Sequence, residues 1–212
     1  MQIKTFTFNP FMENTYVVYD QGKAAIIDPG CYDPAEEKEL VEFVQKEGLE
    51  VEKILSTHGH IDHVLGNAFV KNHFNIPLWI GEHDQETLRS VAAYAPSYGF
   101  QKYTAVEPDV LMKEGEYITI GSSQLKVLFV PGHAPGHIAF YHETEGFVLG
   151  GDVLFRESIG RTDLPGGDFD TLINSIRTEF FTLPNDTVVY PGHGGETTIG
   201  YEKKYNPFCK VA

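Results

Sequence analysis

The sequence is poor in cysteine, and this shortage excludes a cysteine-based metal site. Its 2 cysteines, Cys31 and Cys209, form no pair of the kind that holds a structural zinc ion. Little cysteine is typical of proteins in reducing compartments, so we expect a cytoplasmic location. A Cys31–Cys209 disulfide is the alternative, and it would require export.

Basic residues and long apolar runs are also scarce. The chain has 16 Lys and Arg against 30 Asp and Glu, which gives a net charge of −14. Such a surface repels phosphate backbones and anionic lipids, so we expect neither nucleic acid nor membrane as a partner. No apolar run approaches the roughly 20 residues of a membrane span. Residues Met1–Phe8 alternate apolar and polar side chains, unlike a secretion signal.

The sequence does contain enough apolar residues for one well-buried domain. It has 212 residues, of which 42% are hydrophobic and 22% are charged, and we expect a single domain over residues 1–212. In the first half, residue patterns predict strands and helices with a long loop over residues 93–110. The expected strands are Ile3–Phe8, Thr15–Tyr19, Ala24–Ile27, Val51–Leu55 and Leu78–Ile80, and the expected helices are Asp33–Lys46, Val64–Phe74 and 82–92.

The second half repeats this order of strands and then helices. Strands are expected at 117–120, 124–130, 137–142, 146–150 and 187–190, and a helix at Asp168–Phe181. The last residues are expected to form a short tail or helix. Strand runs followed by helices in both halves favour an α/β protein with two sheets face to face and helices outside.

The stretch Thr57–His63 is the strongest functional signal. It holds four potential metal ligands within six positions: His58, His60, Asp62 and His63. Imidazole and carboxylate suit a divalent transition metal, and the ligands are numerous enough for two ions. This stretch predicts a metal-dependent hydrolase.

Three later residues share one local pattern with this stretch. His133, Asp152 and His193 each follow an apolar strand and one or two Gly or Pro residues. Strand ends can bring distant segments to one rim, and glycine permits close backbone approach there. Together the seven side chains offer five imidazoles and two carboxylates, which suits two ions that share a carboxylate.

These residues resemble the metallo-β-lactamase superfamily, and within it the short single-domain bacterial hydrolases of the glyoxalase II type. The likeness runs from Asn14 to the tail. Besides the ligands, it rests on Ile26–Gly30, Pro131–His137, Gly151–Phe155 and Gly160–Asp163.

The resemblance implies a four-layer αββα sandwich with two mixed sheets and a two-metal centre. One ion would bind His58, His60 and His133, and the other Asp62, His63 and His193, with Asp152 as the bridge. Both carboxylates are catalytic candidates in such a centre. Zinc is the expected metal, with iron or manganese as alternatives.

The implied reaction is hydrolysis of a thioester such as S-lactoylglutathione by a metal-bridging hydroxide. Only 19 residues follow His193 (212 − 193), so we expect no C-terminal helical glutathione-binding domain. The rival readings are a persulfide dioxygenase with one iron, a lactonase or other ester hydrolase, and a non-catalytic binding protein. The expected partner is a small-molecule thioester such as a glutathione thioester, and the expected state is a monomer or small homo-oligomer.

Several single residues keep two interpretations. Asp62 could cap the helix expected from Val64, and Asp152 could form a turn. Asp28 could begin a turn or orient the histidine stretch by hydrogen bonds. Arg161 could pair with Asp163 or Asp168, or contact an anionic substrate.

The remaining histidines serve as controls, because the resemblance gives none of them a metal. His137 is expected to be a strand residue with a structural hydrogen bond. His73 and His83 are expected on exposed helix faces, and His142 is expected in solvent.

Overall fold

The structure, a computed structural model, describes residues 1–210 as two sheets with helices on their outer faces. The first half contains β1 (Gln2–Phe8), β2 (Glu13–Asp20), β3 (Lys23–Ile27), α1 (Pro34–Lys46), β4 (Glu50–Leu55), α2 (Ile61–Val64), α3 (Asn67–Phe74), β5 (Leu78–Gly81), α4 (Gln85–Tyr94) and β6 (Val110–Met112). The second half contains β7 (Tyr117–Ile120), β8 (Ser123–Phe129), β9 (Ile138–His142), β10 (Phe147–Gly151), β11 (Leu154–Phe155), β12 (Ser158–Ile159), α5 (Phe169–Ser175), β13 (Val188–Pro191), β14 (Thr197–Thr198) and α6 (Ile199–Tyr205).

Both large sheets are mixed, as the resemblance implies. The first has the order β1-β2-β3-β4-β5-β6, with antiparallel pairs up to β3 and parallel pairs from β3 to β6. The second has the order β14-β13-β10-β9-β8-β7, in which β10 and β13 run parallel and the other neighbours antiparallel. Strands β11 and β12 form a small separate hairpin.

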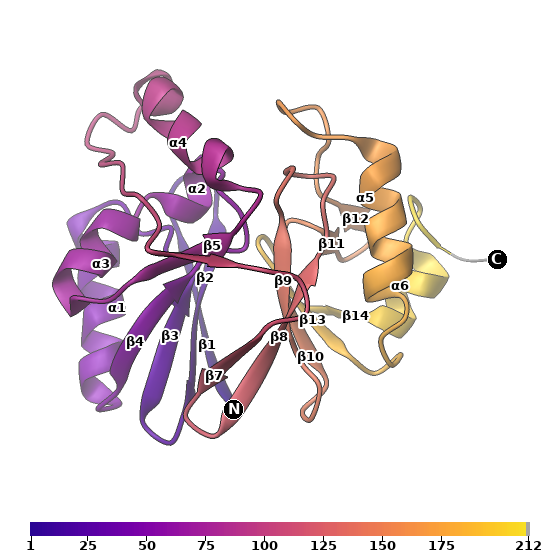
Figure 1. The fold of residues 1–212 in the computed structure, drawn as a ribbon, viewed down its shortest axis with the longest axis horizontal. Coiled ribbons are helices and arrows are strands. Elements are labelled where there is room, and N and C mark those ends of the chain that lie inside the picture. The colour runs from indigo at the N-terminus through magenta and orange to yellow at the C-terminus, as the bar shows by residue number, and fades with distance from the viewer. Residues whose placement is uncertain (211–212) are drawn as a thin grey trace.

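The four layers follow from alternating side chains along the central strands. In β3, Ile26 packs in the core beneath the first-half helices, whereas Ile27 packs between the sheets. Ile54 and Leu55 of β4 divide in the same way. A third core joins the second sheet to α5 and α6. Figure 1 shows α1 and α3 outside one sheet and α5 and α6 outside the other. The αββα sandwich is confirmed.

The expected helix Asp33–Lys46 is confirmed by its capping contacts. The Asp33 side chain accepts the backbone N–H groups of Ala35 and Glu36, while the Glu36 carboxylate accepts the N–H of Asp33. This reciprocal pair is a capping box, and Pro34 occupies the first turn.

Other boundaries differ from the expectation. The helix expected over Val64–Phe74 begins only at Asn67 as α3, and Ile61–Val64 forms the separate short helix α2. Between them lies Gly66, whose N–H donates to the Pro29 carbonyl at 2.8 Å. The helix expected over 82–92 runs instead over Gln85–Tyr94. Strand β6 lies at the end of the expected loop 93–110, which also contains a 3₁₀ turn over Ala95–Tyr98. The helix expected to Phe181 continues after Ser175 as a π-helical turn over Ile176–Phe180.

Two further structural findings concern the cysteines and the helices. Cys31 and Cys209 are both buried free thiols, so they form no disulfide. Among residues 1–210, none of the helices combines the length and the apolar character that crossing a bilayer requires.

Candidate metal centre

The histidine stretch lies in the loop between β4 and α3. His58 and His60 precede α2, and Asp62 and His63 lie within α2. The side chain of Asp62 makes no cap bond to a helix, which corrects the capping interpretation. Its Oδ2 lies instead 3.1 Å from His193 Nε2. His58 and His63 are fully buried, and His60 is nearly so.

The three later residues meet this stretch from the ends of second-sheet strands. His133 follows β8, Asp152 follows β10 and His193 follows β13. The glycine before the ligand is required at two of these ends. A Cβ on Gly151 would lie 2.5 Å from Thr57 Oγ1, and a Cβ on Gly192 would lie 2.1 Å from Asp152 Oδ1. Close backbone approach therefore explains these glycines.

The seven predicted residues come together in two groups. The nitrogen atoms of His58, His60 and His133 lie within 4.8 Å of one another, and so do ligand atoms of Asp62, His63 and His193. Asp152 lies between the groups. Its Oδ1 is 3.4 Å from His63 Nε2, and its Oδ2 is 3.5 Å from His133 Nε2 and 3.6 Å from His193 Nε2.

Hydrogen bonds orient three imidazoles from behind. His63 Nδ1 faces Asp28 Oδ2 at 3.2 Å, His133 Nδ1 faces the Arg161 carbonyl at 2.7 Å, and His193 Nδ1 faces the Phe11 carbonyl at 3.1 Å. Each of these oxygens can only accept, so each Nδ1 carries a proton and Nε2 is the nitrogen left for a metal ion. This is the usual orientation of metal-binding histidines.

His58 follows the same rule through Thr57. The Thr57 hydroxyl donates to Asp28 Oδ2 at 2.6 Å, so its oxygen can accept from His58 Nδ1 at 3.0 Å. His60 differs, because its Nδ1 faces His133 Nε2 at 2.8 Å. The nitrogen atoms left for a metal ion in the first group are therefore Nε2 of His58, Nε2 of His133 and Nδ1 of His60.

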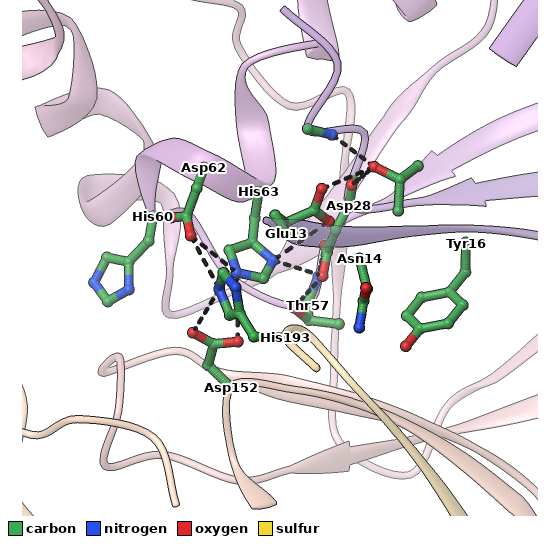
Figure 2. A network of polar contacts seen from close by, with 12 residues as sticks. Glu13, Asn14, Tyr16, Asp28, Thr57, His60, Asp62, His63, Asp152 and His193 are labelled. Carbon is green, nitrogen blue, oxygen red and sulfur yellow. Dashed lines mark hydrogen bonds and ion pairs between the residues drawn. The ribbon is translucent and has the colours of Figure 1, made fainter. Parts of the chain in front are cut away.

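Asp28 also belongs to a third possible group with His58 and His63. Both of its oxygens are already occupied, however, because Oδ1 accepts the Thr57 N–H at 2.7 Å and Oδ2 accepts the Thr57 hydroxyl. Asp28 holds a left-handed backbone conformation, with φ 47°, which is unusual outside glycine. Figure 2 shows this carboxylate between Thr57 and His63, with Glu13 beside it. These contacts suit a carboxylate that orients Thr57 and His63 rather than one that binds a metal ion directly.

Strand β2 holds the loop that carries His193. The Asn14 amide donates to the carbonyls of Pro191 and Gly194 at 3.0 and 2.8 Å, and the Tyr16 hydroxyl donates to the Pro191 carbonyl at 2.6 Å. Asn14 and Tyr16 belong to the first sheet, as Figure 2 shows, whereas the loop follows the second sheet. Neither side chain was singled out in the sequence, because the pattern of β2 predicts only a strand.

The arrangement fits divalent cations. His58 Nε2, His63 Nε2 and Asp152 Oδ1 are buried and make no hydrogen bond to any residue in 1–210. Buried polar atoms without a partner are costly, and a cation at the centre would supply that partner. Imidazole and carboxylate are also the donors that zinc, iron and manganese accept.

The pKa shifts of these side chains also fit a site for cations. Burial, with nearby imidazoles, holds the pKa of His58 well below its ordinary value and lowers the pKa of His60 to about 4. Burial opposes the charge of His63, yet the carboxylates of Asp152 and Asp62 outweigh it and raise the pKa of His63. Burial likewise raises the pKa of Asp152, but the charge of His63 outweighs it and lowers that pKa. Burial therefore disfavours a proton on His58 and His60, whereas two carboxylates, Asp62 and Asp152, lie beside His63.

A cavity of about 800 Å³ opens onto both groups. Apolar and aromatic side chains form much of its wall, including Phe11, Tyr94, Tyr98, Phe155 and Ile159. Tyr103, a third tyrosine of the same region, packs instead against the first-half core. Arg161 also lines the cavity, and its guanidinium pairs with Asp163 through two contacts of 2.7 Å. Both interpretations of Arg161 therefore remain compatible with its position.

The control histidines gave a mixed result. His73 and His83 are exposed as expected, although His83 precedes α4 rather than lying on it. His137 precedes β9, and its Nε2 accepts the N–H of Asp152 at 3.0 Å. His142 is buried and stacks on Phe147 at 5.0 Å between ring centroids, so its expected solvent exposure is wrong.

Residues 8–193 match the model of the metallo-beta-lactamase superfamily. The chain belongs to this superfamily. It is a metallo-hydrolase of the superfamily, and its clustered His and Asp side chains form a site for divalent metal.

Known superfamily proteins match nearly the whole chain. The protein named hydroxyacylglutathione hydrolase GloC, from Haemophilus influenzae, is 39% identical over 211 residues, which cover 98% of each chain. The crystal structure of BLEG-1 B3 metallo-beta-lactamase has a TM-score of 0.90 at 36% identity and covers 99% of this chain and 100% of its own. TTHA1623 in a di-iron-bound form has a TM-score of 0.84 at 36% identity and covers 97% and 99%.

Proposed function

We propose that this metallo-β-lactamase-superfamily chain is a two-metal hydrolase of the glyoxalase II type, with a small thioester such as S-lactoylglutathione as its substrate. The observation that carries the proposal is the position of Asp152 between two complete ligand groups. The similarity to the GloC protein supports the thioester. A persulfide dioxygenase needs only one iron, so one of the two ligand groups would hold no metal.

In the proposed centre, His58, His60 and His133 hold one ion, and Asp62, His63 and His193 hold the other. Zinc is the expected metal, and the di-iron form of TTHA1623 makes iron the first alternative. Two such ions lower the pKa of bound water to about 7 and polarise an acyl carbonyl.

The chain's own residues place the substrate and move the proton. Asp62 lines the cavity, so its carboxylate can accept the proton that an attacking water releases. The aromatic wall covers the acyl group and excludes bulk water. Arg161 is the cavity's cation, and it contacts a carboxylate of the thiol carrier when its pair with Asp163 opens.

A thioester suits this site better than an amide. The leaving thiolate departs without a proton, whereas an amide nitrogen needs a positioned acid. The likeness to BLEG-1 B3 metallo-beta-lactamase nevertheless gives β-lactam hydrolysis as the second candidate. The proposal also includes one domain over residues 1–212, acting in the cytoplasm as a monomer or small homo-oligomer.

A substrate panel tests the proposed reaction. The metal-loaded protein is assayed with S-lactoylglutathione, a simple lactone, a β-lactam and glutathione persulfide with oxygen uptake. We expect kcat/KM for the thioester to exceed that for the lactone and β-lactam by at least about 100-fold, a difference of roughly 2.7 kcal/mol. Preferred β-lactam turnover, or oxygen uptake with the persulfide, would replace the proposal. Inactivity toward all four compounds would favour a binding protein.

A further inference from the structure

Asp84 stands at the start of α4 but does not cap that helix. It occupies the N-cap position, where an Asp side chain ordinarily accepts an N–H group of the first helical turn. Its carboxylate makes no such bond, and only its backbone carbonyl accepts from Leu88, at 3.1 Å. The side chain is therefore directed elsewhere, and Asp84 is fully buried.

The carboxylate of Asp84 joins the two loops that supply the first ligand group. Its Oδ2 accepts the backbone N–H of Gly59 at 2.5 Å, and its Oδ1 accepts the N–H of Gly136 at 3.1 Å. Gly59 lies between His58 and His60, and Gly136 lies three residues after His133. The Thr87 hydroxyl donates to Oδ1 at 2.8 Å and fixes the carboxylate from the helix side.

The backbone at both glycines lies in close contact with the first turn of α4. A Cβ on Gly59 would lie 2.5 Å from the backbone nitrogen of Leu88, and a Cβ on Gly136 would lie 2.2 Å from that of Asp84. The two loops therefore reach the same end of one helix from opposite sheets. A displacement of Asp84 would shift both loops, because each loop lies in direct contact with the first turn of α4.

We propose that Asp84 is a positioning residue that ties the loop of His58 and His60 to the loop of His133, and so sets the spacing of the three imidazoles for one metal ion. Its side-chain hydrogen bonds go to Gly59, Thr87 and Gly136, and none of them joins one of the seven ligand side chains. It acts through two backbone N–H groups that have few other ways to be satisfied when buried. The proposal rests on the two-ion centre proposed above.

The fixed spacing matters because an ion selects its ligands by geometry. His60 Nδ1 and His133 Nε2 lie 2.8 Å apart although they come from different loops, and the rings of His58 and His133 lie 4.9 Å apart between centroids. Loops that could separate would lose this arrangement between binding events. Residues that orient metal ligands typically contribute about 10–100-fold in metal affinity.

The test variant is Asp84→Asn, which keeps the size of the side chain. The amide has one acceptor oxygen, so its NH₂ group must face one of the two backbone N–H groups. Stepwise zinc affinities are measured on the full chain by competition with a chelating dye. We expect one of the two affinities to fall by about 10–100-fold and the other to change by less than about threefold.

Asp33→Asn is the matched control, because Asp33 caps α1 with an exposed side chain and contacts neither metal loop. It should leave both affinities unchanged. The wild-type titration separates the two proposals: a chain that binds only one ion refutes the two-metal centre, whatever Asp84 does. With two ions bound, unchanged affinities in Asp84→Asn, or an equal loss at both sites, overturn the positioning role.

A second variant decides the matter if Asp84→Asn does not fold. Asp84→Glu keeps both acceptor oxygens and the charge but adds one methylene, which pushes the two loops away from α4. The positioning role predicts a selective loss of at least about tenfold at one of the two sites, the lower end of the usual range for such residues. Wild-type affinities at both sites in Asp84→Glu would overturn it.

Discussion

At the scale of single residues, Asp152 is the side chain that would join the two ligand groups into one centre. Its oxygens face nitrogen atoms of both groups at 3.4–3.6 Å, and its N–H donates to His137. The carboxylate also provides much of the attraction that raises the pKa of His63. Asp152 therefore contributes both its negative charge, which acts on His63, and its two oxygens, which face the two ligand groups.

Replacement of Asp152 by Asn should abolish most of the activity. The amide keeps the shape but loses the charge and one acceptor oxygen, so kcat/KM for S-lactoylglutathione should fall by about 100-fold or more. Asp168→Asn is the control, since it makes the same change at the exposed cap of α5. Activity of Asp152→Asn within tenfold of wild type would contradict a bridging role.

Replacement of Arg161 by Met tests the substrate contact. If the guanidinium binds a carboxylate of the thiol carrier, KM for S-lactoylglutathione should rise about tenfold, with kcat within about twofold. Arg177→Met, on the exposed face after α5, should change neither constant. An unchanged KM would leave the pair with Asp163 as the only role of this side chain.

The sequence identified the metal-site candidates and one supporting residue, Asp28, but not the supporting residues Asp84 and Asn14. His133 and His193 could be found because each follows an apolar strand and a Pro-Gly pair. Asp84 falls within the helix expected over 82–92, and Asn14 directly precedes the strand expected over Thr15–Tyr19, so neither stands out as a supporting residue. Their partners, the backbone groups of Gly136 and Pro191, are brought to them only by folding.

At the scale of elements, the strand ends were predicted well and the helix ends less well. Runs of apolar residues locate β3 and the end of β4, because both faces of these strands are buried in a core. Strand β6, Val110–Met112, is short and follows an irregular segment, so it has no clear period. The division between α2 and α3 depends on Gly66, where the surrounding chain and not the local pattern ends the helix.

Gly66→Ala should destabilise the joint between α2 and α3. The added Cβ would lie 2.5 Å from Cys31 Sγ and 2.8 Å from the Pro29 carbonyl oxygen, so the loop must shift. The free energy of unfolding should fall by about 1–3 kcal/mol in chemical denaturation. Gly195→Ala, which has open space around it, should change it by less than about 0.5 kcal/mol. Equal stability of the two variants would show that the joint is not tightly packed.

At the scale of the whole molecule, each proposed ion is held by both halves of the sandwich. His58 and His60 follow a first-sheet strand, whereas His133 follows a second-sheet strand. Asp62 and His63 of the first half likewise meet His193 of the second. The two proposed ions would therefore cross-link the two sheets at one rim, beyond the apolar core that already joins them.

Removal of metal should lower the stability of the whole fold. At free metal about 100-fold above Kd, each ion adds about 2.7 kcal/mol to the free energy of unfolding. Two ions correspond to a Tm decrease of about 10–20 °C on chelation for a chain of this size. Added zinc should restore the Tm and added magnesium should not, because magnesium prefers oxygen ligands. An unchanged Tm would show that the rim carries no strongly bound ion.

The central claim is a two-metal centre that hydrolyses a thioester, and one measurement tests it most directly. Metal content per chain and S-lactoylglutathione turnover are determined on the same purified sample during stepwise chelation. The account predicts two ions per chain, zinc or an alternative divalent metal, with turnover lost as either ion is removed. A fully active sample that holds a single ion would contradict it.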